Sequence, residues 1–201
     1  MTNIGGVTDI TGLRERRRLA TSAEIEAAAF ALFEQRGSEH TTVDDIAAAA
    51  GVSPRTFFRY FPTKEDAVLG VKRAFFETVS ESFARGLDLA GATAEALAEF
   101  SAGDSVPLRR MMQLRCLCKV DDNLRQASLV LDSEQCRLRQ EEVAAAGGAQ
   151  AALRARIAVE TLTVVLNAAL DEWATRRVAG EPADLVDVFR ITCALQRQLC
   201  P

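Results

Sequence analysis

The stretch "TTVDDIAAAAGVSPRTFFRYFPTKE", residues 41–65, decides the fold of this chain. Two short helical segments lie on either side of Gly51, and glycine adopts the positive φ of a sharp turn at low cost. Thr42 is suited to begin the first helix, and Ser53 with the proline that follows it is suited to begin the second. Two short helices joined by a tight turn at a glycine are typical of the helix-turn-helix motif.

The second of these helices, residues 54–60, is too short to persist in water on its own. Phe57 and Phe61 are four residues apart and share one face, so the burial of both rings is predicted to hold the helix in place. The polar side chains that this leaves exposed are Arg55, Thr56, Arg59 and Tyr60. A helix N-terminus with arginines beside it suits insertion into the major groove of DNA. The alternative is a plain helical hairpin with a solvated basic face.

The rest of the chain has helical periodicity and almost no strand pattern. Further helices are expected over about 13–36, 64–88, 93–101, 107–119, 122–146, 150–178 and 183–199. The predicted fold class is therefore all-α, with an N-terminal helix-turn-helix head of three helices followed by a larger helical body. The expected division is a flexible tail over 1–12, the helix-turn-helix domain over 13–62 and the body over 63–201.

The distribution of charge limits where a nucleic acid can bind. The formal net charge is −4, which by itself argues against a nucleic-acid-binding protein. Residues 1–73 hold ten Lys/Arg and ten Asp/Glu, whereas residues 74–201 hold fourteen and eighteen. Any basic surface must therefore be local and lie near the N-terminus.

Cysteine and histidine usage predicts neither a disulfide framework nor a metal site. The five cysteines lack ligand-like spacing, and His40 has no cysteine near it. Cys116 and Cys118 form a C-x-C pair without partners at metal-ligand spacing. Core packing is the expected role of Cys116, Cys193 and Cys136, and redox sensing is the alternative. We find no nucleophile–base pair, paired carboxylates or phosphate loop, so we expect no enzymatic activity and no cofactor. Reduced thiols and an N-terminus without the apolar region of a signal peptide predict a cytoplasmic protein.

Residues 25–69 resemble the DNA-binding domain of the TetR family of transcriptional regulators. The stretches that carry the resemblance are "IEAAAFALFEQRG", "TTVDDIAAAAGVS" and "RTFFRYFPTKEDAV". The resemblance implies an Ω-shaped, all-helical homodimer in which each head binds one half-site of an operator. It also implies that residues 63–201 form the ligand-binding and dimerisation domain.

The resemblance further assigns a DNA-binding surface residue by residue. It assigns Thr42, Arg55, Thr56, Tyr60 and Lys64, and the start and exposed side of the short helix add Ser53 and Arg59 to the candidate DNA-binding residues. Arg55 and Thr56 are implied to face base edges, whereas Thr42, Tyr60 and Lys64 are implied to contact the phosphate backbone.

Two positions depart from the family pattern. Phe58 stands where many members have a phosphate-bonding tyrosine, so that hydrogen bond is either absent or made by another residue. Arg55 stands where many have glycine or alanine, and it is expected to add a fork that reads guanine.

The cluster "RERRR", residues 14–18, contributes Arg16, Arg17 and Arg18 to the candidate DNA-binding residues. One interpretation is a solvated charge run. The neighbouring motif favours the other interpretation, which is a basic arm that reaches phosphate or the minor groove beside the head.

The body sequence offers weaker signals. Family resemblance suggests that the last two helices, about 150–178 and 183–199, pair with their copies as a four-helix dimer interface; the alternative is that they only fill the monomer core. Candidate ligand contacts are Phe76, Phe83, Phe100, Met111, Met112, Arg115 and Trp173. For any one of the aromatic and methionine side chains core packing is the favoured interpretation, but together they indicate a hydrophobic or amphipathic effector.

The predicted function is a ligand-responsive, DNA-binding transcriptional regulator, namely a repressor that a hydrophobic or amphipathic small molecule releases from a palindromic operator. Half-sites would lie about one DNA turn, roughly 34–36 Å, or slightly more apart. One alternative is a helical small-molecule carrier or sensor with a vestigial head, which would show no sequence preference on DNA. A DNA architectural protein is a further alternative, but it would need more net positive charge.

Overall fold

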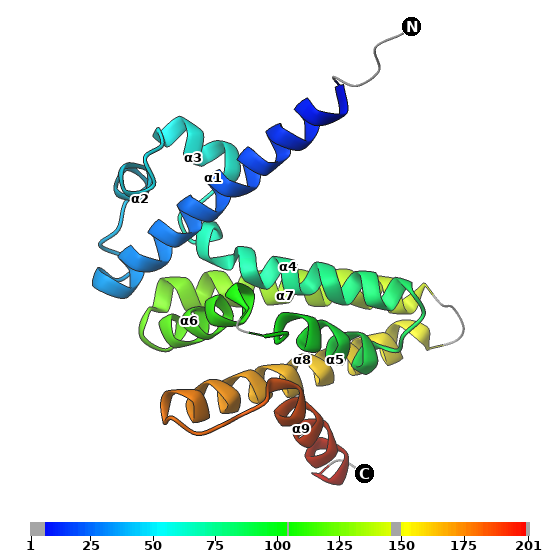
Figure 1. Cartoon of the computed structure of the whole chain (residues 1–201). Helices are drawn as coiled ribbons and strands as arrows, with labels where there is room; N and C mark the ends of the chain where they lie inside the picture. Colours follow the sequence, from blue (N-terminus) through cyan, green and yellow to red (C-terminus); the bar gives the residue numbers. More distant parts are fainter. Residues whose placement is uncertain (1–6, 104, 146–149, 200–201) are drawn as a thin grey trace, which may run out of the picture. The chain divides into compact units, whose positions relative to one another are not determined.

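The structure is a computed structural model that describes residues 7–103, 105–145 and 150–199, and every regular element in these ranges is an α-helix (Figure 1). The helices are α1 (Val7–Arg36), α2 (Val43–Ala49), α3 (Pro54–Tyr60), α4 (Asp66–Ala84), α5 (Leu89–Phe100), α6 (Val106–Val120), α7 (Asp122–Ala144), α8 (Ala151–Val178) and α9 (Leu185–Leu199). The predicted all-α fold is thus confirmed. Among the described helices, none has both the length and the apolar character that crossing a lipid bilayer requires.

Contacts divide the chain into two compact units, Met1–Gly70 and Val71–Pro201. The first contains α1, α2, α3 and the start of α4, and the second contains the rest of α4 and the helices that follow. Residues 7–12, which we expected in a flexible tail, instead begin α1, since extending an existing helix costs little. The remainder of that expected tail, residues 1–6, lies outside the described residues.

The N-terminal unit has a core to which each of its helices contributes. Ile25 and Phe33 of α1, Ile46 of α2 and Phe57 of α3 are at most 1% exposed. α1 contacts α2, and α2 contacts α3. Burying a side chain of this size stabilises a fold by about 1.5–3 kcal/mol. These four residues therefore hold α1, α2 and α3 against one another.

Local signals in the sequence set the helix boundaries in this unit. α1 ends where Gly37 takes a φ of 79° and its N–H donates to the Phe33 carbonyl. At the start of α2 the Asp45 N–H donates to Thr42 Oγ1 at 3.1 Å, and the Thr42 N–H donates to Asp45 Oδ2 at 2.9 Å. Gly51 has a φ of 66°, as the turn requires. The predicted turn and capping box are therefore confirmed.

Substitutions at Gly51 test the turn between α2 and α3. A Cβ added there meets no atom within 4 Å, so the penalty comes from the backbone alone. A left-handed residue with a Cβ costs about 1–2 kcal/mol, but asparagine tolerates this conformation better than alanine. We expect Gly51→Ala to accelerate hydrogen exchange of the Phe57 amide, and Gly51→Asn to stay closer to wild type. Unchanged exchange in the alanine variant would contradict this account of the turn.

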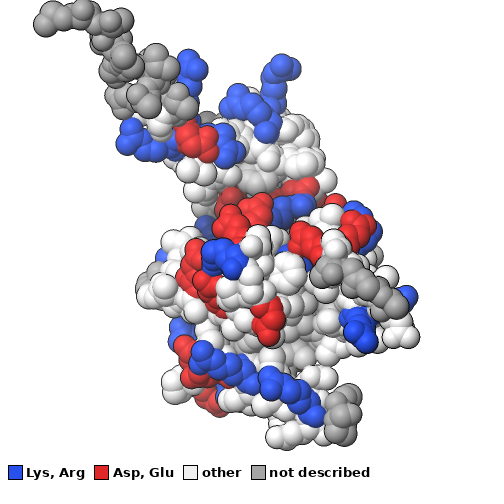
Figure 2. All heavy atoms as spheres, turned by 90° about the vertical axis from the view of Figure 1, so that its right-hand side faces the viewer, with Lys and Arg blue, Asp and Glu red and all other residues white. Residues whose placement is uncertain are grey.

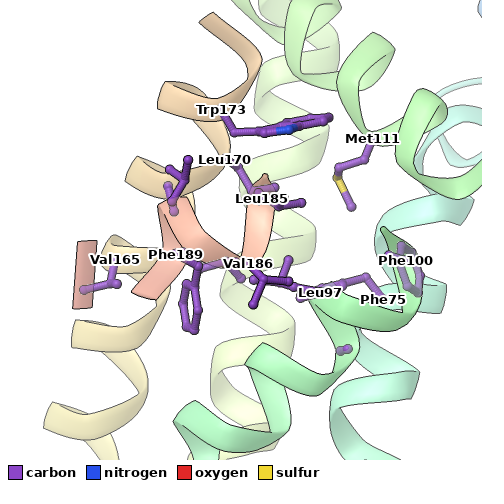
Figure 3. Packing of buried hydrophobic residues seen from close by; sticks show 14 of the residues in the cluster. Phe75, Leu97, Phe100, Met111, Val165, Leu170, Trp173, Leu185, Val186 and Phe189 are labelled. Atoms are coloured by element: carbon purple, nitrogen blue, oxygen red, sulfur yellow. The ribbon is translucent and has the colours of Figure 1, made fainter. Parts of the chain in front are cut away.

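The described residues of the second unit pack around a large hydrophobic cluster (Figure 3). Leu97 of α5, Trp173 of α8 and Phe189 of α9 are at most 2% exposed. The rings of Phe75 on α4 and Phe100 on α5 meet edge to face, with centroids 5.5 Å apart. The cluster thus joins α4 to the helices of the body.

A buried ion pair also joins α4 to α7. Lys72 of α4 is 5% exposed, and its Nζ lies 2.7 Å from Asp132 Oδ1 and donates to Ser128 Oγ at 2.7 Å. Burial lowers the pKa of Lys72, and the charge of Asp132 opposes that shift. The ammonium therefore remains in the interior only because α7 supplies its partners.

Breaking this pair is predicted to cost far more than replacing it. Asp132→Leu leaves the Lys72 ammonium buried without its carboxylate, and we expect a loss of about 3–5 kcal/mol in the free energy of unfolding. The double variant Lys72→Met/Asp132→Leu removes both charges and is expected to be close to wild type or more stable. Trp173, the single tryptophan of the chain, reports unfolding of this unit by fluorescence in urea. A double variant as unstable as Asp132→Leu would contradict the prediction.

Candidate functional site

α3 turns one face toward the interior of the N-terminal unit and the other toward solvent. Phe57 is fully buried and Phe61, directly after the helix, is 8% exposed; their ring centroids are 5.8 Å apart. Arg55, Phe58 and Arg59 are exposed, and Phe58 retains 57% of its surface. The predicted orientation is confirmed, since the two rings hold the helix down and its basic side faces outward.

The first turn of α3 leaves the Arg55 side chain uncommitted. Ser53 caps the helix, because its Oγ accepts the Thr56 N–H at 3.1 Å and lies 2.9 Å from Thr56 Oγ1. The Arg55 guanidinium has no hydrogen bond or ion pair with any residue that the structure describes. Arg55 therefore keeps all its donors for an external acceptor, whereas the Thr56 hydroxyl is already shared with the cap.

The start of α2 has less freedom. Thr42 donates its hydroxyl to Asp45 Oδ2 at 2.7 Å, and Arg36 lies 2.7 Å from the same oxygen. Hydrogen bonds from the backbone and side chain of Thr42 lower the pKa of Asp45, and the Arg36 charge adds to the shift. A phosphate contact by the Thr42 hydroxyl would have to displace Asp45, so this role stays a prediction.

Lys64 has a structural partner that the sequence did not indicate. Its Nζ donates to the carbonyls of Ser38 at 2.5 Å and Thr41 at 3.0 Å, which lie in the loop between α1 and α2. Both of these residues are fully buried. Lys64 therefore fixes the loop that leads into α2, and its predicted contact with the DNA backbone would have to use its remaining donor.

Tyr60, at the end of α3, lies among basic side chains. The Arg59 guanidinium lies 5.3 Å from the centroid of the Tyr60 ring. The pKa of Arg18 on α1 is raised, first by its hydrogen bond to Glu15 and to a smaller extent by Tyr60. The arginine cluster on α1 and the end of α3 therefore lie near each other on the N-terminal unit.

The other arginines of the cluster are free to act on a partner. Arg16 and Arg17 are exposed and have no hydrogen bond or ion pair within the described part of the chain. In the space-filling view, lysine and arginine side chains gather over the N-terminal unit (Figure 2). This local basic surface is consistent with a chain whose net charge is negative.

The body contains small cavities beside α4. The first has a free volume of about 40 Å³, which is room for about three waters. It is lined by Phe75, Phe76, Val79, Leu89, Thr93, Gln135, Cys136, Arg139, Val159, Leu162, Thr163 and Leu166. A second cavity of about 30 Å³ shares the wall made by Phe75 and Phe76.

The predicted ligand contacts are divided among several places. Phe76 lines the first and second cavities, and Met111 and Arg115 line the second. Met112 and Trp173 line a third cavity, of about 200 Å³. The structure thus does not bring these side chains together around one cavity, and their role as ligand contacts stays a prediction.

Three of the candidates have firm intramolecular contacts. Phe100 packs in the core, and the Phe83 ring centroid lies 5.8 Å from the Arg139 guanidinium carbon. Arg115 lies 2.7 Å from Asp171 Oδ1 and donates to Asn167 Oδ1 at 2.8 Å, so its charge is already neutralised.

Sequence reasoning missed the polar residues of the first cavity. Gln135 and Arg139 lie one turn apart on α7, beyond the buried Leu124 and Leu131 of the same helix. Nothing in that pattern marks Arg139, which is 8% exposed, as a buried cation.

The described thiols form no site. Cys116, Cys118, Cys136 and Cys193 are free and partly buried, and Cys200 lies outside the described residues. Burial raises the pKa of Cys118, which disfavours the reactive thiolate. The described residues include no group of three or more side chains placed to bind a metal.

Comparison with known proteins finds sequence similarity in the N-terminal unit. Residues 25–70 match the model of a family described as "Bacterial regulatory proteins, tetR family". The HTH-type transcriptional regulator TcmR of Streptomyces glaucescens is 48% identical over 58 residues, which are 29% of this chain and 26% of that protein. MftR of Mycobacterium tuberculosis, named as a mycofactocin biosynthesis transcriptional regulator, is 47% identical over 49 residues, which are 24% of this chain and 25% of that protein.

These sequence matches span about a quarter of the length of each relative. A crystal structure of Thermus thermophilus FadR, a TetR family transcriptional repressor in complex with lauroyl-CoA, covers 87% of this chain and 92% of that chain, with 22% identity and a TM-score of 0.49. That likeness is too low to transfer a ligand to this chain. The similarity to the tetR family of bacterial regulatory proteins thus lies in residues 25–70.

Proposed function

We propose that this chain is a transcriptional regulator that binds DNA through its N-terminal unit and responds to a small molecule bound in its body. The exposed, uncommitted guanidinium of Arg55 on a helix held by Phe57 carries the proposal. An arginine so placed suits a bidentate contact with guanine in the major groove. The family match over residues 25–70 supports the same role.

The proposed assembly is a homodimer formed through α8 and α9. Both helices expose large apolar side chains, with Ile157 58% and Val164 69% exposed on α8, and Ile191 55% and Leu195 50% exposed on α9. A monomer rarely leaves so many apolar side chains in water on adjacent helices. Two-fold pairing would cover them and present two heads to a palindromic operator in the cytoplasm.

The proposed response is repression that a hydrophobic or amphipathic effector relieves. α4 is continuous across the boundary between the two units, and Phe76 of this helix lines two cavities. An effector shifts the population only if it binds the form with low DNA affinity more tightly than the other. Operator and effector would then weaken each other's binding by the same factor.

Arg55→Ala tests the proposed reading of DNA. The measurement compares binding to a duplex from upstream of the gene for this chain with binding to a scrambled duplex of equal length. Removing a bidentate base contact costs about 1–3 kcal/mol, so we expect specific affinity to fall by about tenfold or more. Affinity for the scrambled duplex should change little, because Arg55 is proposed to bind a base and not a phosphate.

The matched control is Arg16→Gln/Arg17→Gln, which removes exposed charges from α1. Its affinity should fall equally for both duplexes. The slope of log K against the logarithm of the salt concentration should become less steep by about 0.9 for each phosphate that the variant no longer neutralises. An Arg55 variant with an unchanged preference for its duplex would contradict the assignment. Equal affinity of the wild type for both duplexes would instead favour a small-molecule carrier with a vestigial head.

Leu195→Glu tests the proposed dimer. We expect light scattering to give twice the 21.8 kDa chain mass for wild type and the single chain mass for the variant, because a charge in an apolar interface is costly. Leu129→Glu on α7 is the control, since Leu129 is 54% exposed but lies outside α8 and α9. A monomeric wild type, or a Leu195→Glu chain that remains dimeric, would overturn the proposed interface.

A further inference from the structure

The first cavity of the body is mostly apolar but has a cation in its wall. Arg139 of α7 lines it and is 8% exposed. Its guanidinium donates to Ser80 Oγ at 2.5 Å and to the Phe76 carbonyl at 3.4 Å, and both acceptors belong to α4. A buried cation of α7 therefore holds one turn of α4.

The guanidinium has two neutral partners and one charged partner. Ser80 and the Phe76 carbonyl are neutral acceptors, so neither offers the guanidinium the full negative charge and bidentate geometry of a carboxylate. The one carboxylate at Arg139 among the described residues is that of Glu142, whose Oε2 lies 2.5 Å from the guanidinium and whose side chain is 48% exposed. Water screens that pair, so on its α4 side Arg139 retains attraction for a second anion.

A second donor lines the same cavity. Gln135 lies four residues before Arg139, on the same face of α7. Its carboxamide has no hydrogen-bond partner among the residues that the structure describes. Around these two polar groups the wall is formed mainly by rings and aliphatic side chains, including Phe75, Phe76 and Leu162.

We propose that this cavity binds a hydrophobic carboxylic acid, whose carboxylate pairs with Arg139 and Gln135 and whose apolar part packs against Phe75 and Phe76. Only the effect of such an acid on DNA binding rests on the proposed function. A free volume of about 40 Å³ does not admit such a molecule, so the walls must separate as it enters. The carboxylate would take the guanidinium from Ser80 and the Phe76 carbonyl and so release α4 from α7.

The test uses the full chain and three probes of matched shape: 4-phenylbutanoate, 4-phenylbutanamide and 4-phenylbutylamine. Isothermal titration calorimetry should give the acid about tenfold higher affinity than the amide, because one charge-assisted hydrogen bond contributes about that much. The amine should not bind. Equal affinities of acid and amide, or no heat from any probe at millimolar concentration, would overturn the proposal.

Substitutions locate the site. Arg139→Gln should bind acid and amide equally, whereas Arg137→Gln should keep the wild-type preference, since Arg137 is exposed and pairs only with Glu141 among the described residues. If Arg139→Gln does not fold, two milder variants replace it. Gln135→Leu should weaken the acid several-fold, and Ser80→Ala should strengthen it, because α4 then competes less for Arg139. Unchanged affinity of the acid in both variants would contradict the assignment.

Operator binding separates this inference from the proposed function. Tight acid binding that leaves DNA affinity unchanged would uphold the ligand class and refute the effector role. Sequence-specific DNA binding by a chain with no preference for the acid would leave the regulator intact and refute the carboxylate site.

Discussion

The proposed DNA-binding surface of the N-terminal unit depends on the burial of Phe57 beneath a helix of seven residues, Pro54–Tyr60. Ordering a backbone costs roughly 1–2 kcal/mol per residue, and burying Phe57 returns only about 1.5–3 kcal/mol. The ring alone therefore does not hold α3. The Ser53 cap, the packing of Phe61 and the turn at Gly51 must act with it, and all of them leave the Arg55 side free.

Features with short-range causes could be predicted from the sequence. The turn at Gly51, the box of Thr42 and Asp45 and the caps of the short helices each depend on a few neighbouring residues, and the structure contains them. The contacts of Lys64 could not be predicted, because its acceptors lie more than twenty residues earlier in the chain. The Thr42 hydroxyl is engaged by a local partner, Asp45, and this contact decides how freely the start of α2 meets a phosphate.

In the body, even the burial of polar side chains could not be predicted, because no sequence pattern distinguishes a buried cation from an exposed one. Lys72 and Arg139 read as surface charges on amphipathic or polar helices, yet both are more than nine-tenths buried. They act in opposite directions, because Lys72 of α4 reaches acceptors on α7 and Arg139 of α7 reaches acceptors on α4. Two cations thus hold one helix pair, and α4 is also the helix that continues from the N-terminal unit. A ligand that competes for either cation would loosen that pair.

We infer that α3 stays folded, and can read DNA as proposed, only while Phe57 is buried. Hydrogen exchange of the amides of residues 55–60 in Phe57→Ala, measured together with operator binding by the same protein, tests it most directly. The account predicts that these amides lose protection and that sequence-specific binding disappears, while the fluorescence of Trp173 shows an intact body. Protected α3 amides together with wild-type operator affinity would contradict it.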